Sequence, residues 1–304
     1  MHCYDLTEEL TLSGPSAVTL GKFDGVHRGH QKLMKHVLGI CRDEALESVV
    51  CTISGRSEGL LLTPAEQEEA VRLLGIDTIV RCPLTERLSH MTPDEFVSRI
   101  LKEHLHAAHV VIGTDFCFGY RRSGSAAWLK DHEKEYDLDV VVLEKELYGS
   151  REISSTYIRE ALAAHDMPLA QALMGRPYTL NGTVVHGRRV GHDLGYPTAN
   201  LRAEPSKLLP PDGVYISRTW AEGQWYRSMT DIGVRPTFAD TGTRSIETAL
   251  LDADLDLYGH SIRVELLSYL RPEQSFADAA RLRDQLRRDE ESVRAFTAAG
   301  SEES

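Results

Sequence analysis

The chain has 304 residues, of which 41% are hydrophobic and 26% charged, and its formal net charge at pH 7 is -12. This length favours two domains over one, and the composition is that of an ordinary globular protein. An acidic molecule repels the phosphate backbone of nucleic acids and anionic lipid surfaces, so neither is expected as its main partner.

The amino-terminal segment MHCYDLTEEL has neither a basic nor an apolar stretch, so it does not read as a signal peptide. We find no apolar run long enough to span a bilayer. The cysteines, at positions 3, 41, 51, 82 and 117, form no CxxC pair, and free thiols in a reducing compartment are the simplest interpretation. We therefore expect a cytoplasmic protein, and the sequence leaves self-association open.

The first half of the chain alternates strand-like and helix-like segments. Apolar, strand-like segments lie at 16–20, 48–53, 77–82, 108–113 and 138–144. Helices are expected from His30 onward and over 63–75 and 92–105, and the last two begin with a Thr-Pro pair typical of a helix start. The alternation predicts a Rossmann-like α/β domain, whose parallel sheet binds ligands beyond the carboxyl ends of its strands.

After about residue 175 the pattern changes to short β-rich segments separated by glycine-containing turns. These segments are 178–187, 213–220, 224–234, 244–252 and 261–270. They predict a small antiparallel β-barrel, followed by a terminal helix over 275–296 that begins at a Ser275 cap. We place the boundary so that the domains are 1–175 and 176–304.

Charged residues gather between the first expected strand and the next helix, in GKFDGVHRGH at 21–30. The free N–H groups at a helix start carry partial positive charge, and Gly25 and Gly29 let the backbone approach a ligand. His27 and His30 are then placed to donate hydrogen bonds to phosphate oxygens. The segment suggests a nucleoside triphosphate site, with surface histidines or half of a zinc site as alternatives.

A second candidate is ISSTYIR at 153–159. Ser155 and Thr156 fit the first turn of a helix, and Arg159 lies on the same helical face. Hydroxyl groups, amides and a guanidinium would then converge on one anion. A plain serine cap with a solvated arginine is the alternative.

Three segments together resemble the nucleotidyltransferase module of bacterial bifunctional riboflavin kinase/FMN adenylyltransferases, also called FAD synthetases. They are GKFDGVHRGH at 21–30, GTDFCFGYRRSG at 113–124 and EISSTYIREAL at 152–162. The resemblance implies attack by the FMN phosphate on the α-phosphorus of ATP, which gives FAD and pyrophosphate. It also implies that His27 and His30 hold the ATP phosphates from one side and Arg159 from the other, with no general base because the nucleophile is already an anion.

By the same resemblance, further residues of this module bind the flavin or the nucleotide. They are Gly21, Phe23, Asp24, Gly29, Asp115, Phe116, Ser155 and Thr156. A loop carboxylate and a core aromatic are the alternatives for Asp115 and Phe116. Where relatives commonly have a TFDPHP-like segment, this chain has TISGRSEGLLL at 52–62. Adenylyl transfer is therefore less firmly implied than the histidines alone suggest, and Arg56 is either a partial substitute or a solvated loop residue.

Four segments of the second half resemble the riboflavin kinase module of the same family. They are VVHGRRVGHDLGYPTANL at 184–201, PDGVYISRTW at 211–220, DIGVRPTF at 231–238 and the block at 245–276. Pro197 favours extended backbone, so that Thr198 and Asn200 can present oxygens suited to magnesium carrying ATP phosphates, whereas PTAN alone could be a local turn. The resemblance adds Gly191, Gly195 and Pro197 to the nucleotide-binding residues.

Phosphorylation of riboflavin needs a base, because a neutral alcohol is the attacking group. The resemblance points to Glu247. Strand alternation places Glu247 on one face with Ala249 and Leu251, where partial desolvation would raise its pKa. Ile246 makes the other face apolar too, so the sequence leaves open which way Glu247 points.

The sequence thus predicts a two-domain enzyme that converts riboflavin to FMN in the barrel and FMN to FAD in the α/β domain. Its small-molecule partners would be riboflavin, FMN and ATP, with Mg²⁺ accompanying ATP in both reactions. Two alternatives stay open: a riboflavin kinase with a degenerate adenylyltransferase domain, and a non-catalytic flavin-binding regulator.

Overall fold

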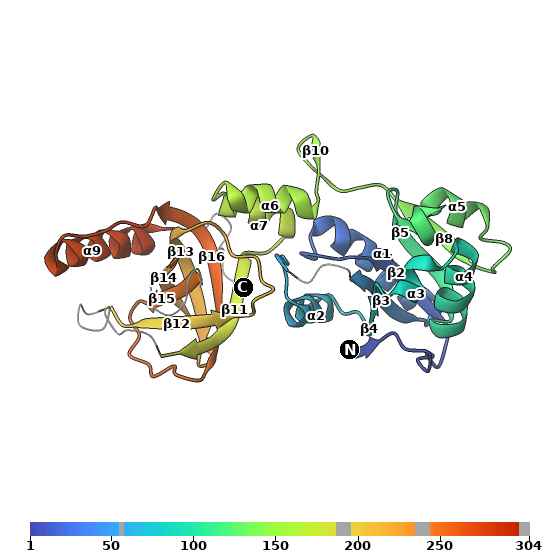
Figure 1. Cartoon of the computed structure of the whole chain (residues 1–304), viewed down its shortest axis with the longest axis horizontal. Coiled ribbons are helices and arrows are strands. Elements are labelled where there is room, and N and C mark those ends of the chain that lie inside the picture. Colours follow the sequence, from blue (N-terminus) through green and yellow to red (C-terminus); the bar gives the residue numbers. More distant parts are fainter. Residues whose placement is uncertain (55–57, 187–195, 235–243, 298–304) are drawn as a thin grey trace. The chain divides into compact units, whose positions relative to one another are not determined.

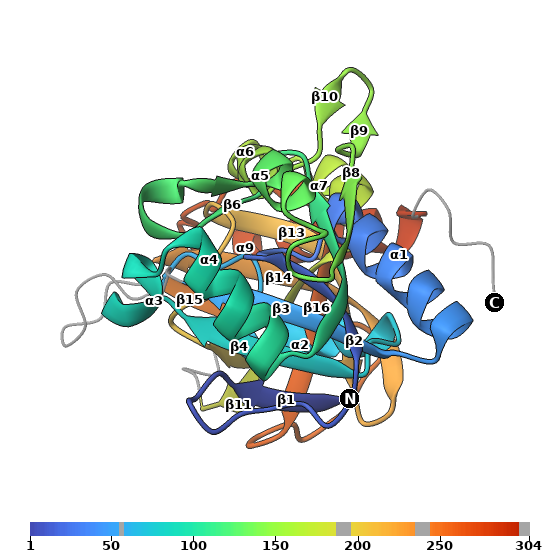
Figure 2. The same ribbon diagram turned by 90° about the vertical axis from the view of Figure 1, so that its right-hand side faces the viewer.

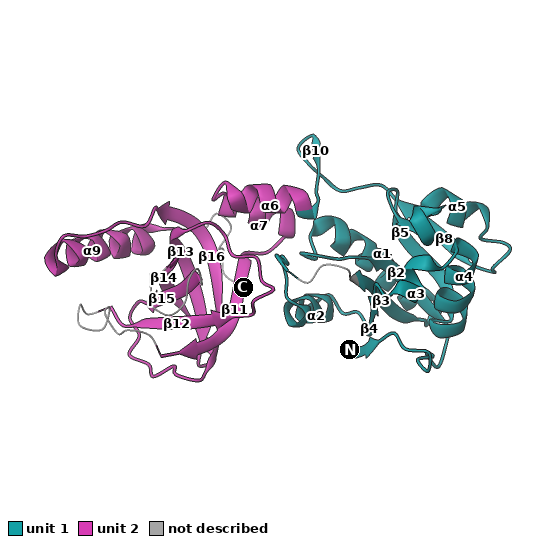
Figure 3. Cartoon of the chain, in the orientation of Figure 1, with its two compact units in different colours: residues 1–155 teal, residues 156–304 magenta. Residues whose placement is uncertain are grey.

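A computed structural model describes residues 1–54, 58–186, 196–234 and 244–297 of the chain. The chain divides into two compact units, Met1–Ser155 and Thr156–Ser304 (Figure 3). By this division helix α6 (Ser155–Ala163), from its second residue onward, and helix α7 (Met167–Met174) belong to the second unit. The domain boundary expected after residue 175 stays a prediction.

The first unit contains a six-stranded sheet in the order β1-β4-β3-β2-β5-β8, and every neighbouring pair is parallel. Its strands are β1 (His2–Asp5), β2 (Ser16–Gly21), β3 (Glu47–Ser54), β4 (Thr78–Pro83), β5 (Ala107–Gly113) and β8 (Asp139–Leu143). The five expected strands are confirmed. Sequence reasoning missed β1, which lies at the sheet edge (Figure 2), because all four of its residues are exposed and carry no apolar pattern.

Helices cover both faces of this sheet. On one face, Ala17 of β2 packs with Val37 of α1 (Arg28–Glu44). On the other face, Val18 of β2 belongs to a core that includes Phe96 of the π-helix η1 (Phe96–His104). Because adjacent residues of β2 contact opposite layers, the strand is apolar on both sides, which is typical of a parallel sheet between helices.

Short elements complete the first unit. They are α2 (Pro64–Leu73), α3 (Glu86–His90), α4 (Pro93–Glu95), β6 (Cys117–Phe118), the 3₁₀-helix η2 (Tyr120–Arg122), β7 (Gly124–Ser125), α5 (Ala126–Asp131), β9 (Leu147–Tyr148) and β10 (Arg151–Glu152). The expected Thr63 and Thr92 caps are confirmed, and each forms a capping box with the glutamate three residues later.

The order of the strands reverses between β2 and β5. From β2 the chain builds outward through β3 and β4, and then returns to place β5 on the other side of β2. Ligands of open α/β sheets bind beyond the carboxyl ends of the strands at such a reversal. The loops 22–27 and 114–116, which follow β2 and β5, therefore both begin at this position.

The second unit contains a closed antiparallel barrel in the order β11-β12-β15-β14-β13-β16 (Figure 1). The strands are β11 (Tyr178–Val185), β12 (Thr198–Ala203), β13 (Gly213–Ala221), β14 (Gln224–Val234), β15 (Arg244–Leu250) and β16 (Ser261–Arg271). The predicted barrel is thus confirmed. Across the described ranges, which omit 55–57, 187–195, 235–243 and 298–304, no helix is both long and apolar enough to cross a membrane.

The terminal helix α9 (Ala279–Ala295) lies against β13 and β14. Its N-cap is Asp278, whose side chain accepts a hydrogen bond from the Arg281 N–H. The expected cap at Ser275 is therefore wrong. The cause is local: the chain before the helix, including Phe276, runs along a cavity wall instead of turning into the helix.

Five hydroxyl groups form a closed ring of hydrogen bonds inside the barrel. They belong to Ser217, Thr219, Ser228, Thr230 and Thr248, which are all buried. The ring runs from Ser217 to Thr230 (2.8 Å), to Thr248 (3.0 Å), to Thr219 (3.3 Å), to Ser228 (2.9 Å) and back to Ser217 (2.7 Å). Each hydroxyl can donate one bond and accept one, so the ring satisfies all five polar groups without water.

Removal of one hydroxyl should destabilise the barrel. Thr248→Val keeps the side-chain shape but leaves its two ring neighbours each short of a partner, at a cost of about 1–3 kcal/mol. Scanning calorimetry on the full chain would detect this as a lower melting temperature of the second unit. The control Thr183→Val changes an exposed strand position of the same barrel and should leave that temperature unchanged. Equal melting of the two variants would show that the ring adds no stability.

Candidate active sites

The loop between β2 and α1 has a strained backbone. Phe23, Gly25 and Val26 have positive φ values of 48°, 91° and 38°. For a β-branched residue such as Val26 this conformation is rare, and each such residue costs about 1–3 kcal/mol. The surrounding structure must therefore hold the loop in place.

Side-chain amides from two helices hold the carbonyl groups of this loop. Gln31 of α1 donates to the Val26 carbonyl (2.9 Å), and Gln67 of α2 donates to the Phe23 carbonyl (3.1 Å). The Phe23 ring is itself buried, and a Cβ at Gly21 would lie 3.1 Å from it. The Phe23 ring therefore packs closely against Gly21, where the loop begins.

Asp24 connects this loop to two other segments. Its Oδ1 accepts a hydrogen bond from the Leu61 N–H (2.9 Å), and its carbonyl accepts one from the Ser155 hydroxyl (2.8 Å). Leu61 belongs to the segment that departs from the family pattern. The departure therefore removes the usual Asp, Pro and His but leaves a backbone donor that supports the loop.

His27 and His30 form a stacked pair on the first turn of α1. Their ring centroids are 3.5 Å apart, with 20° between the planes, and the Phe23 ring meets the His30 ring edge-on at 5.2 Å. His27 is the N-cap, because its Nδ1 accepts from the His30 N–H (3.4 Å). A neutral imidazole in this role carries its proton on Nε2, which makes Nε2 a donor.

The surroundings of His27 and His30 differ from those of surface histidines. His27 is only 5% exposed, so it is not an ordinary surface histidine. For zinc, the part of the chain that the structure describes contains no group of three or more His, Cys, Asp or Glu side chains placed to hold a metal. The geometry instead presents N–H groups at a helix start, which is an arrangement that binds anions.

Asp115 and Phe116 follow β5 at the same edge of the sheet. The Asp115 side chain is 70% exposed and pairs with Lys145 (3.2 Å), whose pKa is raised by its hydrogen bond to Glu152 and also by Asp115. The Phe116 ring stacks on Phe118 at 5.6 Å and packs against the core. Contact of these two residues with flavin or nucleotide stays a prediction.

Helix α6 begins where the sequence indicated. Ser155 is its first residue, and its hydroxyl binds the strained loop as described above. Thr156 is exposed and Arg159 is half-buried one turn later. Their action on phosphate stays a prediction.

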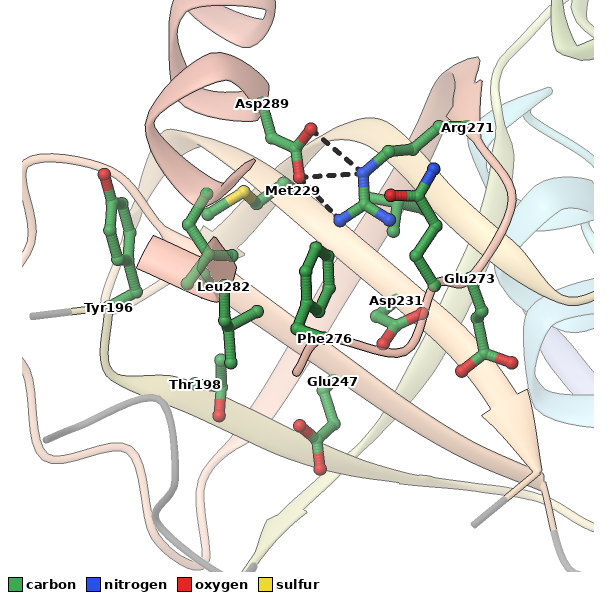
Figure 4. Close-up of a pocket in the computed structure, with 14 residues that line it drawn as sticks. Tyr196, Thr198, Met229, Asp231, Glu247, Arg271, Glu273, Phe276, Leu282 and Asp289 are labelled. Carbon is green, nitrogen blue, oxygen red and sulfur yellow. Dashed lines mark hydrogen bonds and ion pairs between the residues drawn. The ribbon is translucent and has the colours of Figure 1, made fainter. Parts of the chain in front are cut away.

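A cavity of about 260 Å³ lies on the outer face of the barrel, beside α9 (Figure 4). Its polar lining residues are Tyr196, Thr198, Asp231, Glu247, Arg271, Glu273, Gln274 and Asp289. Its apolar lining residues are Val214, Met229, Ala249, Phe276, Leu282 and Leu286. An apolar cavity with a few converging polar groups is the usual form of a small-molecule site.

Strand register decides the orientation of Glu247, which the sequence left open. Glu247 and Ala249 line the cavity, whereas Ile246 and Thr248 between and beside them are buried in the barrel. Glu247 is paired with Asn200 on β12 and with Asp231 on β14. The candidate base Glu247 is therefore flanked in register by the expected metal ligand Asn200 on one neighbouring strand and by the carboxylate Asp231 on the other.

Thr198 also lies on this face, opposite Ala249, and it begins β12, so the local-turn alternative for PTAN is wrong. A second cavity of about 330 Å³ is lined by Thr198 together with Pro197 and by residues 253–258. Thr198 thus lies at the wall of both cavities. Gly191, Gly195 and Arg56, which the sequence also singled out, lie outside the described residues.

Sequence reasoning missed several residues of the first cavity. Asp231 lies in the matched DIGVRPTF segment, which was a signal for it, but its side chain was not singled out. Arg271 and Asp289 form a bidentate ion pair (2.7–3.0 Å), and Gln285 donates a further bond to Asp289 (2.8 Å). Arg271 at the end of β16 and Asp289 on α9 are 18 residues apart in the sequence. No local sequence pattern predicts such a contact.

Comparisons with known proteins agree with this geometry in both units. The profile of the FAD synthetase family matches residues 11–157, and that of the riboflavin kinase family matches residues 174–297. The bifunctional riboflavin kinase/FMN adenylyltransferase of Listeria monocytogenes is 35% identical in an alignment of 293 residues, which covers 92% of this chain and 92% of that protein. The enzyme of the same name from Escherichia coli K12 is 34% identical in an alignment of 289 residues, which also covers 92% of each chain.

A solved structure is similar over the whole chain. It is a crystal structure titled a macrolide-efflux protein from Streptococcus pneumoniae, with 29% identity and a TM-score of 0.89 over 98% of this chain and 100% of that one. Its title names another activity, whereas the two family profiles and the curated relatives agree with one another.

Two glycines of α1 offer a test of the histidine geometry. A Cβ at Gly29 would lie 3.3 Å from the buried His27 ring, whereas a Cβ at Gly39 would meet nothing within 4 Å. We expect Gly39→Ala to stabilise the first unit by about 0.5–1 kcal/mol, because alanine favours helix. Gly29→Ala should instead lower its stability by about 1 kcal/mol and shift the His27 and His30 resonances in NMR spectra. Unchanged resonances in Gly29→Ala would contradict the tight fit.

Proposed function

Since the chain belongs to the family of bifunctional riboflavin kinase/FMN adenylyltransferases, we propose that it phosphorylates riboflavin to FMN and then adenylylates FMN to FAD. Both reactions use ATP, and the second releases pyrophosphate. We assign adenylyl transfer to residues 1–175 and phosphorylation to residues 176–304. The bound small molecules are riboflavin, FMN, FAD and ATP.

One observation carries the kinase assignment: Thr198 lines two neighbouring cavities, and Glu247 faces one of them. A phosphoryl transfer needs two substrates whose reacting ends meet, and Thr198 stands where the ends of two bound molecules would meet. We assign riboflavin to the cavity beside α9, because its mixed apolar and polar lining suits a ring with an apolar dimethylbenzene end, and because the ribityl 5′-hydroxyl needs a base such as Glu247. ATP then belongs in the cavity lined by Pro197.

In this arrangement Glu247 takes the proton from the 5′-hydroxyl of riboflavin as the hydroxyl oxygen attacks the γ-phosphorus, and ADP leaves. Thr198 and Asn200 alternate on the Glu247 side of β12 and offer a hydroxyl and an amide oxygen. These hard neutral oxygens fit Mg²⁺ carrying ATP phosphates. When bound, the ion would neutralise charge on the transferring phosphoryl group.

In the first unit, the FMN phosphate oxygen attacks the α-phosphorus of ATP and pyrophosphate leaves. His27 Nε2, the His30 ring and the N–H groups at the start of α1 would stabilise the departing charge. The strained loop keeps these donors fixed before the substrate binds. By family resemblance, Thr156 and Arg159 of α6 are further candidates for binding phosphate.

The altered segment 52–62 supports a second candidate, a riboflavin kinase whose adenylyltransferase domain is inactive. Incubation of the purified chain with riboflavin, ATP and Mg²⁺, followed by chromatography of the flavins, separates the two. FAD formation supports the bifunctional enzyme, and accumulation of FMN alone supports the second candidate.

We place the enzyme in the cytoplasm, where its thiols stay reduced. Self-association of the chain stays a proposal that sedimentation would test.

Two substitutions should separate the activities. Glu247→Ala removes the base and should reduce FMN formation by at least about 100-fold, the usual contribution of general-base catalysis, while FMN supplied from outside is still converted to FAD. His30→Ala should do the reverse. Separate assays of the two half-reactions on each folded variant make the comparison. Equal damage to both activities by either substitution would refute the division of labour.

Removal of metal should stop both reactions, because ATP is used in both as its magnesium complex. EDTA should abolish turnover and added Mg²⁺ should restore it. Asn200→Ala should raise the Mg²⁺ concentration needed for riboflavin phosphorylation without changing that for adenylyl transfer, since one oxygen ligand is lost. An unchanged Mg²⁺ requirement in this variant would remove Asn200 from the metal site.

A further inference from the structure

Strand β12 begins at Thr198, and the pairing of β12 with β11 that the structure describes starts only at Asn200, opposite Val185. The pairing of β12 with β15 runs from Thr198, opposite Ala249, to Leu201, opposite Ile246. The residue before Thr198 is Pro197, which has no N–H to donate. Pro197 therefore cannot hold the chain just before Thr198 through a main-chain N–H.

Tyr196 supplies a side-chain contact at this point. Its ring lines the first cavity (Figure 4), and its hydroxyl donates a hydrogen bond of 2.6 Å to Oε2 of Glu290 on α9. Nε of Arg294 donates to Oε1 of the same carboxylate (2.9 Å). Arg294 also forms a bidentate pair with Asp252, just after β15 (2.7 and 2.8 Å). The start of β12 is thus tied, through α9, to the end of β15.

The charges in this network favour a strong bond at neutral pH. Burial, and then the hydrogen bond to Glu290, raise the pKa of Tyr196 to about 12, so the hydroxyl keeps its proton. The same bond lowers the pKa of Glu290, and Arg294 lowers that of Asp252. A neutral donor thus faces an ionised acceptor, and such bonds are stronger than those between neutral groups.

Other contacts already hold α9 on the barrel. Arg271 binds Asp289 of α9 through three hydrogen bonds, and the side chains of Leu286 and Val293 pack against the β-strands. The Tyr196–Glu290 bond is therefore not needed to attach the helix. Its distinct effect is on the strand that carries Thr198 and Asn200.

We propose that Tyr196 is a positioning residue for riboflavin phosphorylation, because its hydrogen bond to Glu290 fixes the start of β12 and so places Thr198 and Asn200 relative to Glu247. This inference rests on the proposed kinase function. Tyr196 acts through Thr198 and Asn200, so its loss should weaken the use of Mg²⁺–ATP more than the binding of riboflavin.

The test compares Tyr196→Phe with Glu290→Gln and Glu290→Ala in the full chain. Tyr196→Phe keeps the ring in the cavity but loses the bond, and Glu290→Ala loses it from the other side. Each should raise KM for Mg²⁺–ATP about tenfold, the effect of losing one hydrogen bond to a charged group, with a much smaller change in KM for riboflavin. Glu290→Gln keeps an acceptor oxygen without the charge, so it should raise KM for Mg²⁺–ATP less than Glu290→Ala does.

Tyr226→Phe is the matched control. It removes the hydroxyl of a β14 tyrosine that does not line the cavity, and it should leave both KM values unchanged. The melting temperature of the second unit, measured on the same preparations, reports whether the barrel of each variant is folded. The double variant Tyr196→Phe/Glu290→Ala should be no worse than Glu290→Ala alone, because Glu290→Ala has already removed the bond that Tyr196→Phe removes.

Three results would overturn the inference. They are an unchanged KM for Mg²⁺–ATP in Tyr196→Phe, additive losses in the double variant, and equal damage from Glu290→Gln and Glu290→Ala. Failure of the wild-type chain to phosphorylate riboflavin would overturn the proposed kinase function as well, and the unsubstituted enzyme alone would reveal it.

Discussion

The register between β12 and β15 is the constraint on which the chemistry of the barrel depends. Side chains alternate along a strand, so a shift of one residue would move every side chain to the other face. In the observed register Asn200 meets Glu247 on the cavity side, while Thr248 completes the hydroxyl ring on the inner side. Burial of that ring makes the alternative register costly, because its hydroxyls would lose their partners. The hydroxyl ring inside the barrel thereby helps to determine the geometry of the cavity on its outer face.

In the first unit, the geometry of the candidate phosphate site depends on the strained loop after β2. A parallel sheet places the loops after β2 and β5 at the reversal of strand order, and the loop after β2 is then forced into a strained form. Hydrogen bonds from Gln31, Gln67 and Ser155 hold that form. The helix N-terminus and the stacked histidines are therefore preorganised for an anion. This local arrangement matters in a chain of net charge -12, whose overall field repels phosphate.

The segment 52–62 has a different significance in the structure than in the sequence. Compared with the family pattern it lacks an Asp, a Pro and a His. In the structure, Leu61 is fully buried and its N–H holds the Asp24 carboxylate. The segment therefore still supports the loop that carries the histidines, even though it lacks the residues that relatives have there. Support for the loop and direct contact with substrate are separate functions of this segment.

The sequence by itself determined the two fold classes, the Thr63 and Thr92 caps, and the segments that match the family. These features depend on residues close together in the chain, where periodicity and turn chemistry act. Only the tertiary structure decided the direction of Glu247, the Arg271–Asp289 pair and the Tyr196–Glu290 bond. Each depends on contacts between elements that are distant in the sequence. These contacts are determined by strand register and helix packing, to which the whole barrel contributes. Local patterns carry no information about such contacts, which is also why the exposed strand β1 was missed.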